Sequence, residues 1–174
     1  MYLYPTTQTP FKVAVGADIT KSEPTYDNGW SGVANPNGEL SVKGQTFPYL
    51  FWEGRGLGVY PKVNFGRLVS TQNAKAEISS DLKKMSLSDK EIADFNNFWL
   101  PKMPSSKYIR LSWLTNSDLD KLAPLSISPK PDSVIRVFLD FAGYNEPISL
   151  NSQTLPKFTR TGFTAVEWGG LLKK

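Results

Sequence analysis

"VIRVFLDF", residues 134–141, is the most strand-like run in the chain. Nearly all of its residues are apolar, and it lacks the apolar–polar alternation of a strand with one face in water. Such a run is typical of a strand covered on both faces, so we predict a central strand of a sheet. Its two charged residues, Arg136 and Asp140, are four positions apart and therefore share one face of that strand.

Two further runs in the second half of the chain predict strands. "KYIRLSWL" occupies residues 107–114, and "GFTAVEW" occupies residues 162–168 near the end of the chain. The segment between them, "SISPKPDS" at 126–133, contains Pro129 and Pro131. Because proline removes a backbone donor and restricts the residue before it, we expect no regular structure in this segment.

The middle of the chain has helical patterns. A helix is predicted over residues 73–85, whose apolar side chains recur at helical spacing. A second helix is predicted after Ser88, because Ser88 and Glu91 form a capping-box signature and Pro101 provides a stop. Its apolar stripe consists of Ile92, Phe95, Phe98 and Trp99. We also expect one short helical turn in "NSDLDKLA" at 116–123.

The first 70 residues favour β-structure. "FKVAVGADI" at 11–19 alternates apolar and other residues with the period of a half-buried strand. "NPNG" at 35–38 is a turn signature, and we expect it to join 29–34 and 39–44 as a hairpin.

The order of these segments predicts an α+β fold. A β-rich part at 1–70 is followed by a helical part at 73–100 and a second β-rich part at 107–170. We expect a mainly antiparallel, sandwich-like sheet with two helices inserted in the middle of the chain. A length of 174 residues predicts a single globular domain over 1–174.

The composition excludes several chemistries. The chain contains neither cysteine nor histidine, which excludes Cys/His zinc sites, thiol catalysis and Ser-His-Asp catalysis by this chain. We expect no metal site and no cofactor. The net charge of +4 is spread along the sequence rather than gathered in one run, so we do not expect a nucleic-acid partner. We also expect no transmembrane segment and no signal peptide in this chain.

Two acids in apolar surroundings are the main catalytic candidates. Glu53 follows Trp52 in "YLFWEG", and Glu167 precedes Trp168 in "AVEWGG". Two carboxylates about 5–10 Å apart in a cleft are what a glycosidase needs, and aromatic rings stack on sugars. This alternative interpretation makes the chain a carbohydrate-active enzyme or a lectin-like domain that uses these four residues.

The same acids have a structural interpretation, which we favour. A buried charge must be paired, and each acid can pair with an arginine such as Arg110 or Arg136. Under the catalytic alternative, the adjacent glycines would leave room for a ligand; these are Gly54, Gly169 and Gly170.

Two other features bear on binding. "GRGLG" at 54–58 has no helix pattern after it, so we interpret it as a glycine-rich turn and not as a phosphate-binding loop. Tyr26 and Trp30 lie in a turn-rich stretch, where large aromatic side chains often serve binding surfaces. The candidate ligand-binding residues are therefore Trp52, Trp168, Trp30 and Tyr26.

The chain resembles a family of bacterial domains of unknown function. The resemblance rests on runs that occur in this order: "YLYP" at 2–5, "YDNGW" at 26–30, "YLFWEG" at 49–54, "FWLPKM" at 98–103, "ISPKPDSVIRVFLDF" at 127–141 and "GFTAVEWGG" at 162–170. Members of that family are often exported or membrane-anchored. The resemblance implies a coherent domain at the cell envelope, and it assigns no activity and no catalytic residue.

We therefore expect a non-catalytic binding or structural module of the bacterial cell envelope, with a protein or glycan partner. We expect it to lie outside the cell or at its surface, as part of a longer exported protein. The carbohydrate-active alternative built on Glu53 and Glu167 remains open at this stage.

Overall fold

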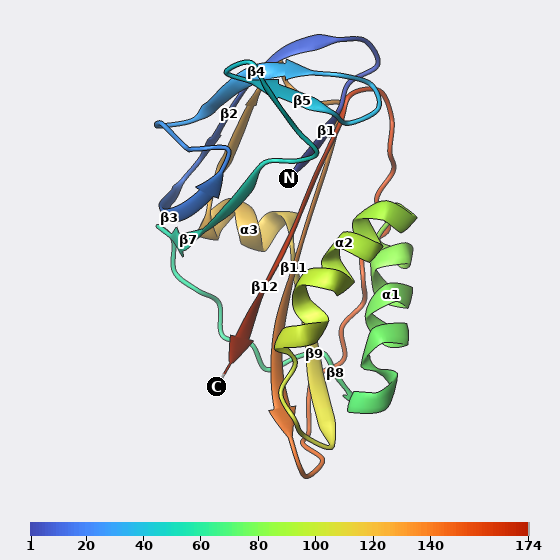
Figure 1. Ribbon diagram of the computed structural model, residues 1–174. Helices are drawn as coiled ribbons and strands as arrows, with labels where there is room; N and C mark the ends of the chain where they lie inside the picture. Colours follow the sequence, from blue (N-terminus) through green and yellow to red (C-terminus); the bar gives the residue numbers. More distant parts are fainter. Residues whose placement is uncertain (174) are drawn as a thin grey trace. The chain divides into compact units, whose positions relative to one another are not determined.

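The computed structural model describes residues 1–173 (Figure 1). Its contacts divide the chain into two compact units. The first unit comprises residues 1–61, 116–136 and 160–167, and the second comprises 62–115, 137–159 and the segment from Trp168 on. The single domain expected from the length thus stays a prediction, and each unit is described by itself.

The first unit is built mostly from short strands. They are β1 (Tyr2–Tyr4), β2 (Thr9–Val15), β3 (Ala17–Glu23), β4 (Trp30–Ala34), β5 (Leu40–Val42), β6 (Gln45–Phe47), β7 (Phe51–Gly56) and β10 (Leu125–Ser128). One sheet has the strand order β10-β2-β4-β5-β6, and β3 and β7 form a separate antiparallel pair. The short helix α3 (Asn116–Leu122) confirms the helical turn expected there.

The hairpin predicted around "NPNG" is confirmed. β4 and β5 pair antiparallel, with Ala34 opposite Leu40. The amide of Asn35 donates to the carbonyl of Glu39 at 2.9 Å, and that of Gly38 donates back to Asn35 at 2.9 Å. Gly38 has φ +87°, a conformation that glycine adopts without the steric cost of a side chain.

The expectation of irregular structure over 126–133 is wrong for its first three residues and for its last, Ser133, which begins β11 (Ser133–Tyr144). Ser126–Ser128 belong to β10, which pairs antiparallel with β2, Ile127 lying opposite Val13. β10 is at the edge of its sheet and ends immediately before Pro129. Because a sheet edge needs donors on one side only, a strand can extend up to a proline there.

The second unit combines two helices with strands. It contains β8 (Arg67–Ser70), α1 (Ala74–Lys84), α2 (Asp89–Trp99) and β9 (Tyr108–Thr115), with 3₁₀ turns at Thr71–Asn73 and Leu100–Lys102. β9 pairs antiparallel with β8 and with β11. Figure 1 shows α1 and α2 side by side. α2 packs on β9 through Phe95 and Trp113, whose ring centroids are 5.8 Å apart.

The start of α2 follows the capping-box signature. The Ser88 side chain accepts from the amide of Glu91 at 3.3 Å, and the Glu91 carboxylate accepts from the amide of Ser88 at 2.7 Å. Both bonds satisfy donors that the first helical turn leaves without a partner. The predicted helix start is confirmed.

Two long strands, β11 (Ser133–Tyr144) and β12 (Thr164–Lys173), continue from the first unit into the second. The strand order of their sheet is β1-β12-β11-β9-β8, so β11 is an internal strand as "VIRVFLDF" predicts. Named strand pairs are antiparallel, and the two main helices lie in the middle of the chain, which confirms the α+β prediction. Within the described residues, none of the helices is long and apolar enough to cross a membrane.

Candidate functional site

Glu167, one of the two candidate acids, is held on both of its oxygens. It lies on β12 in the first unit and is 7% exposed. Its Oε2 accepts from Nε of Arg136 at 2.7 Å, and its Oε1 accepts from the indole Nε1 of Trp52 at 3.0 Å. Both oxygens are therefore engaged by donors of the protein itself.

Arg136, on β11, has hydrogen-bond partners in addition to Glu167. Its Nη1 donates to Asp120 of α3 at 2.8 Å, and its Nη2 donates to the carbonyl of Ala123 at 2.8 Å. Only 1% of Arg136 is exposed. A buried guanidinium with hydrogen bonds in three directions is stabilised in place and joins β11, β12 and the end of α3.

Glu53, the other candidate acid, lies at the surface. It is on β7, with half of its side chain exposed, and its Oε1 is 3.7 Å from Nζ of Lys21 on β3. Successive side chains of a strand point to opposite faces, so Glu53 and the neighbouring Trp52 point away from each other. The prediction of an arginine partner holds for Glu167 and is wrong for Glu53.

The other arginine that the sequence offered pairs elsewhere. Arg110 on β9 is bonded to Asp140 on β11, and both side chains are buried in the second unit. Arg136 and Asp140 thus have separate partners although they share one strand face.

Two of the candidate ligand-binding aromatics are part of the interior of the first unit. Trp30 is 2% exposed, and its Nε1 donates to the carbonyl of Pro24 at 2.8 Å. Tyr26 is half-buried against Trp30, with ring centroids 4.6 Å apart, and its hydroxyl donates to the carbonyl of Val15 at 3.3 Å. These contacts give both rings a packing role.

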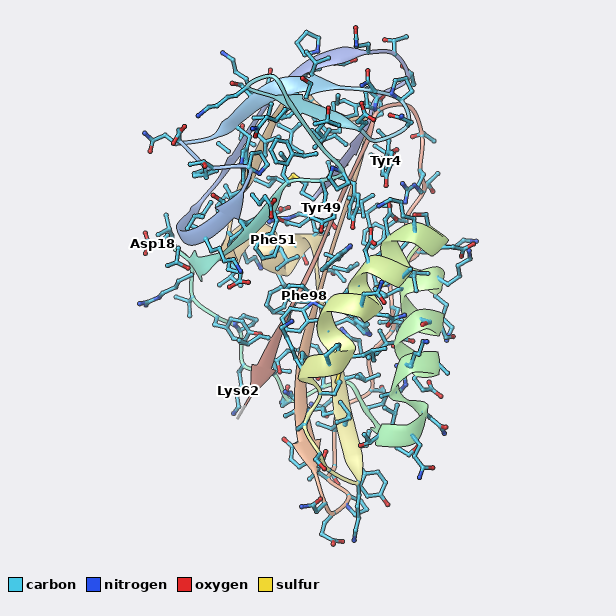
Figure 2. The ribbon with its side chains drawn as sticks, viewed as in Figure 1. Tyr4, Asp18, Tyr49, Phe51, Lys62 and Phe98 are labelled. Atoms are coloured by element: carbon cyan, nitrogen blue, oxygen red, sulfur yellow. The ribbon has the colours of Figure 1, made fainter. Side chains whose placement is uncertain are left out.

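Trp168 is the candidate aromatic that lies in the second unit. It is half-buried, and its ring is 5.4 Å from that of Phe95 and 6.2 Å from that of Phe98, both on α2. Phe98, labelled in Figure 2, is on α2. The ammonium of Lys102 lies over its ring, 3.6 Å from the ring centroid. The structure brings Trp52 to Glu167 but gives Trp168 different neighbours.

The glycines beside the two acids do not leave space for a ligand, contrary to the catalytic alternative. A Cβ on Gly54 would collide with the carbonyl oxygen of Asp18 on β3. A Cβ on Gly170 would lie 2.9 Å from the ring of Trp99, and one on Gly169 would lie 3.1 Å from Phe138. Backbone or ring atoms thus occupy the space beside Gly54 and Gly170, whereas Gly169 is limited only by the side chain of Phe138.

The second unit has a polar groove that the sequence did not predict. Its volume is about 640 Å³, within the range of small-molecule sites. Residues of β8, α1, the turn after α1 and the segment 153–157 surround it: Arg67, Asp81, Lys83, Lys84, Ser86, Gln153, Leu155 and Lys157. Four of these side chains are cationic and one is anionic.

Asp81 and Arg67 form the fixed part of this groove. Asp81 is 1% exposed, and its two oxygens accept from Nη1 and Nη2 of Arg67 at 2.7 and 3.1 Å. The indole Nε1 of Trp113 donates to the same carboxylate at 2.8 Å. Burial by itself would lower the pKa of Arg67, but hydrogen bonds and charge from Asp81 and Glu77 outweigh it, so its pKa is raised.

One signal in the sequence points to this site. Ile78, Leu82 and Met85 form the apolar stripe of α1, and Asp81 lies on the same face three residues after Ile78. A carboxylate on an apolar helix face needs a buried partner. The partner, Arg67, comes from a separate strand, and no spacing rule connects the two.

Metal ligation finds no support in the described part of the chain, residues 1–173. No three acidic side chains there are grouped so that they could hold an ion.

Comparison with known proteins gives one bacterial relative. No family model matches the chain, and no solved structure matches it. The chain is similar to a Butyrivibrio fibrisolvens protein that bears the name "Uncharacterized protein in bglA 3'region", with 34% identity over 59 residues. These residues are 31% of this chain and 62% of that protein, so the match covers less than two thirds of the relative. Similarity to an uncharacterised bacterial protein agrees with the resemblance found in the sequence.

Proposed function

We propose that the chain is a non-catalytic binding module of the bacterial cell envelope and that the groove of the second unit takes its ligand. The observation that carries the non-catalytic part is the double engagement of Glu167 by Arg136 and Trp52. A general acid or nucleophile needs an oxygen that can reach the substrate. Substrate would have to displace a buried arginine to gain access to this one.

The other buried charges support the same interpretation. In the part of the chain whose burial is described, the buried charged side chains are Asp81, Glu91, Arg110, Arg136, Asp140 and Glu167. Each has a partner within the protein, in an ion pair or in the capping box of α2. Pairs of this kind fix the positions of strands and helices and leave no buried acid poised for proton transfer.

The groove supports the binding part of the proposal. Arg67 neutralises the charge of Asp81, and 38% of the Arg67 side chain is still exposed. Two exposed lysines, Lys84 and Lys157, line different parts of the groove. Leu155 adds an apolar contact. This combination suits a ligand with negative charge, the chemistry that an acidic glycan and an acidic peptide share.

Titration calorimetry with heparin and with polyglutamate tests the proposal and separates the two kinds of ligand. The groove variant is Lys84→Gln/Lys157→Gln. The control, Lys12→Gln/Lys130→Gln, removes the same charge from exposed positions of the first unit. We expect wild type and control to bind one probe and the groove variant to lose at least tenfold in affinity.

Three results would contradict the proposal. Equal affinity of both double variants for a probe would mean that the groove is not the binding site. If wild type binds neither heparin nor polyglutamate, the ligand is not anionic. Hydrolysis of a glycan panel by wild type would make the chain an enzyme.

A further inference from the structure

Glycine alternates with larger side chains over residues 54–59, "GRGLGV". The first three of these residues end β7, and the other three follow it without regular structure. In an extended chain, alternate residues face opposite ways. We call residues 54–59 the glycine-alternating segment.

The glycine side of this segment lies against backbone. A Cβ on Gly54 would collide with the carbonyl oxygen of Asp18, the residue labelled in Figure 2 at the start of β3. A Cβ on Gly56 would collide with the carbonyl oxygen of Leu122, and one on Gly58 with that of Lys121. Because the obstacles are backbone atoms, they cannot move aside as a flexible side chain can.

Hydrogen bonds fix the same stretch. The amide of Gly58 donates to the carbonyl of Leu122 at 2.9 Å, at the end of α3, and the amide of Leu57 donates to the carbonyl of Gly16 at 3.4 Å. The backbone around Leu57 is therefore attached to two other parts of the first unit. A loop attached in this way presents its outward side chains in a fixed arrangement.

The outward side of the segment is apolar and carries one cation, Arg55, which lies opposite the exposed Asp18 of β3. Leu57 is 67% exposed and Val59 is 92% exposed, and Arg55 is also exposed. Across the residues whose burial is described, the exposed large hydrophobics are Leu57, Val59, Ile148 and Leu171, and the first two are by far the most exposed. A value of 92% means that Val59 protrudes and has almost no neighbours.

We propose that the glycine-alternating segment contacts an anionic lipid surface. Leu57 and Val59 enter the boundary between head groups and acyl chains, while Arg55 and the adjacent exposed Lys121 contact lipid phosphates. Apolar insertion and electrostatic attraction are two signals that together give reversible membrane binding, and the chain's net charge of +4 adds long-range attraction.

The shape of the segment favours a lipid surface over a protein partner. A stable protein interface requires a broad complementary surface with a contiguous core. Here two protruding side chains stand beside cations. Lipid can close around such a protrusion without a preformed pocket. This inference does not depend on the proposed function, because an enzyme or a binding module could contact a membrane in this way.

Vesicle co-sedimentation of the full chain tests the inference. The vesicles consist of phosphatidylcholine alone or of phosphatidylcholine mixed with phosphatidylglycerol. We expect binding to the mixed vesicles that weakens with added salt. Leu57→Ser/Val59→Ser should reduce it at least tenfold. Ile148→Ser, which changes another exposed hydrophobic residue, should leave it unchanged.

A second readout identifies the residue that inserts. Val59→Cys introduces the single cysteine of the chain at the most exposed position, and the fluorescence of an environment-sensitive dye attached to it should shift to the blue when mixed vesicles are added. A red-shifted spectrum that does not respond to bound vesicles would overturn the insertion of this segment.

Other outcomes would also overturn the inference. These are absence of vesicle binding by wild type, equal binding to both kinds of vesicle, and loss of binding in the groove variant while Leu57→Ser/Val59→Ser still binds. Self-association that the Leu57→Ser/Val59→Ser variant abolishes, without vesicle binding, would assign the segment to a second copy of the chain.

Discussion

Arg136 of β11 and Glu167 of β12 form a buried ion pair, with Nε and Oε2 2.7 Å apart. Glu167→Gln keeps the size of the side chain and removes its charge. The variant leaves the Arg136 charge without its buried partner, because Asp120, the other partner, is 61% exposed. We expect a loss of about 3–5 kcal/mol in the free energy of unfolding, measured by urea denaturation.

Glu53→Gln is the matched control for that substitution. Glu53 is also a glutamate next to a tryptophan, since it follows Trp52 as Glu167 precedes Trp168. Its partner Lys21, however, is exposed. An exposed ion pair contributes about 0–1 kcal/mol, so this variant should unfold close to wild type. Equal losses in the two variants would contradict the difference in burial that the structure assigns to them.

Trp52→Phe tests the indole bond to Glu167. The substitution keeps an aromatic side chain and removes the donor that lies 3.0 Å from Oε1. A hydrogen bond to a charged acceptor contributes about 1.5–3 kcal/mol. We expect a loss in that range in wild type and a smaller one in the Glu167→Gln background. Additive losses in a double-mutant cycle would mean that the two side chains do not interact.

Arg67→Lys tests the groove's fixed part. Lysine keeps the charge but cannot form the two parallel bonds to Asp81. We expect a loss of about 1 kcal/mol, below the range of about 1.5–3 kcal/mol for a charged hydrogen bond, because Arg67 is partly exposed. Since the pKa of Arg67 is raised, its stabilisation is fully present below the unfolded pKa and is lost only above it. The difference in unfolding free energy between wild type and Arg67→Lys should therefore not change between about pH 6 and pH 9, because both arginine and lysine stay protonated there.

Local patterns predicted the elements well. The turn residues of "NPNG" and the capping box at Ser88 depend on neighbours in sequence, and the structure confirms the β4–β5 hairpin and α2. The strand expected over "FKVAVGADI" is confirmed for residues 11–15 in β2, but the chain leaves that strand at Gly16 and residues 17–19 belong to β3 of a different sheet. The error over 126–128 arose because the proline rule ignores strand position. A strand at the edge of a sheet tolerates a proline next to it, whereas a central strand needs hydrogen-bond donors on both sides.

The site was harder to predict because it depends on contacts between distant residues. Glu53 and Glu167 have similar sequence surroundings, yet one is exposed and the other buried. Strand pairing decides which face of each strand is covered, and sequence alone does not give that pairing. For the same reason, the ion pair between Arg67 and Asp81 could not be predicted from the sequence.

Ser88→Ala tests whether the capping box contributes as its geometry indicates. The variant removes the hydroxyl that accepts from the amide of Glu91 at 3.3 Å. The bond from the backbone amide of residue 88 to the Glu91 carboxylate does not need the hydroxyl. We expect a loss of about 1 kcal/mol in the free energy of unfolding. Ser80→Ala, an exposed change inside α1, should be neutral or slightly stabilising because alanine favours helix.

Gly58→Ala links the stability of the first unit to the glycine-alternating segment. Its Cβ would collide with the carbonyl oxygen of Lys121, so the backbone of the segment or of α3 must shift. We expect a loss of about 1–3 kcal/mol, the usual cost of forcing extra atoms into a packed site. Gly169→Ala is the control, since its Cβ would lie 3.1 Å from the ring of Phe138, which can rotate away.

If the fixed backbone is what presents Leu57 and Val59, Gly58→Ala should also weaken vesicle binding at a temperature where the variant is still folded. Full vesicle binding by a destabilised Gly58→Ala variant would show that the glycines serve packing alone.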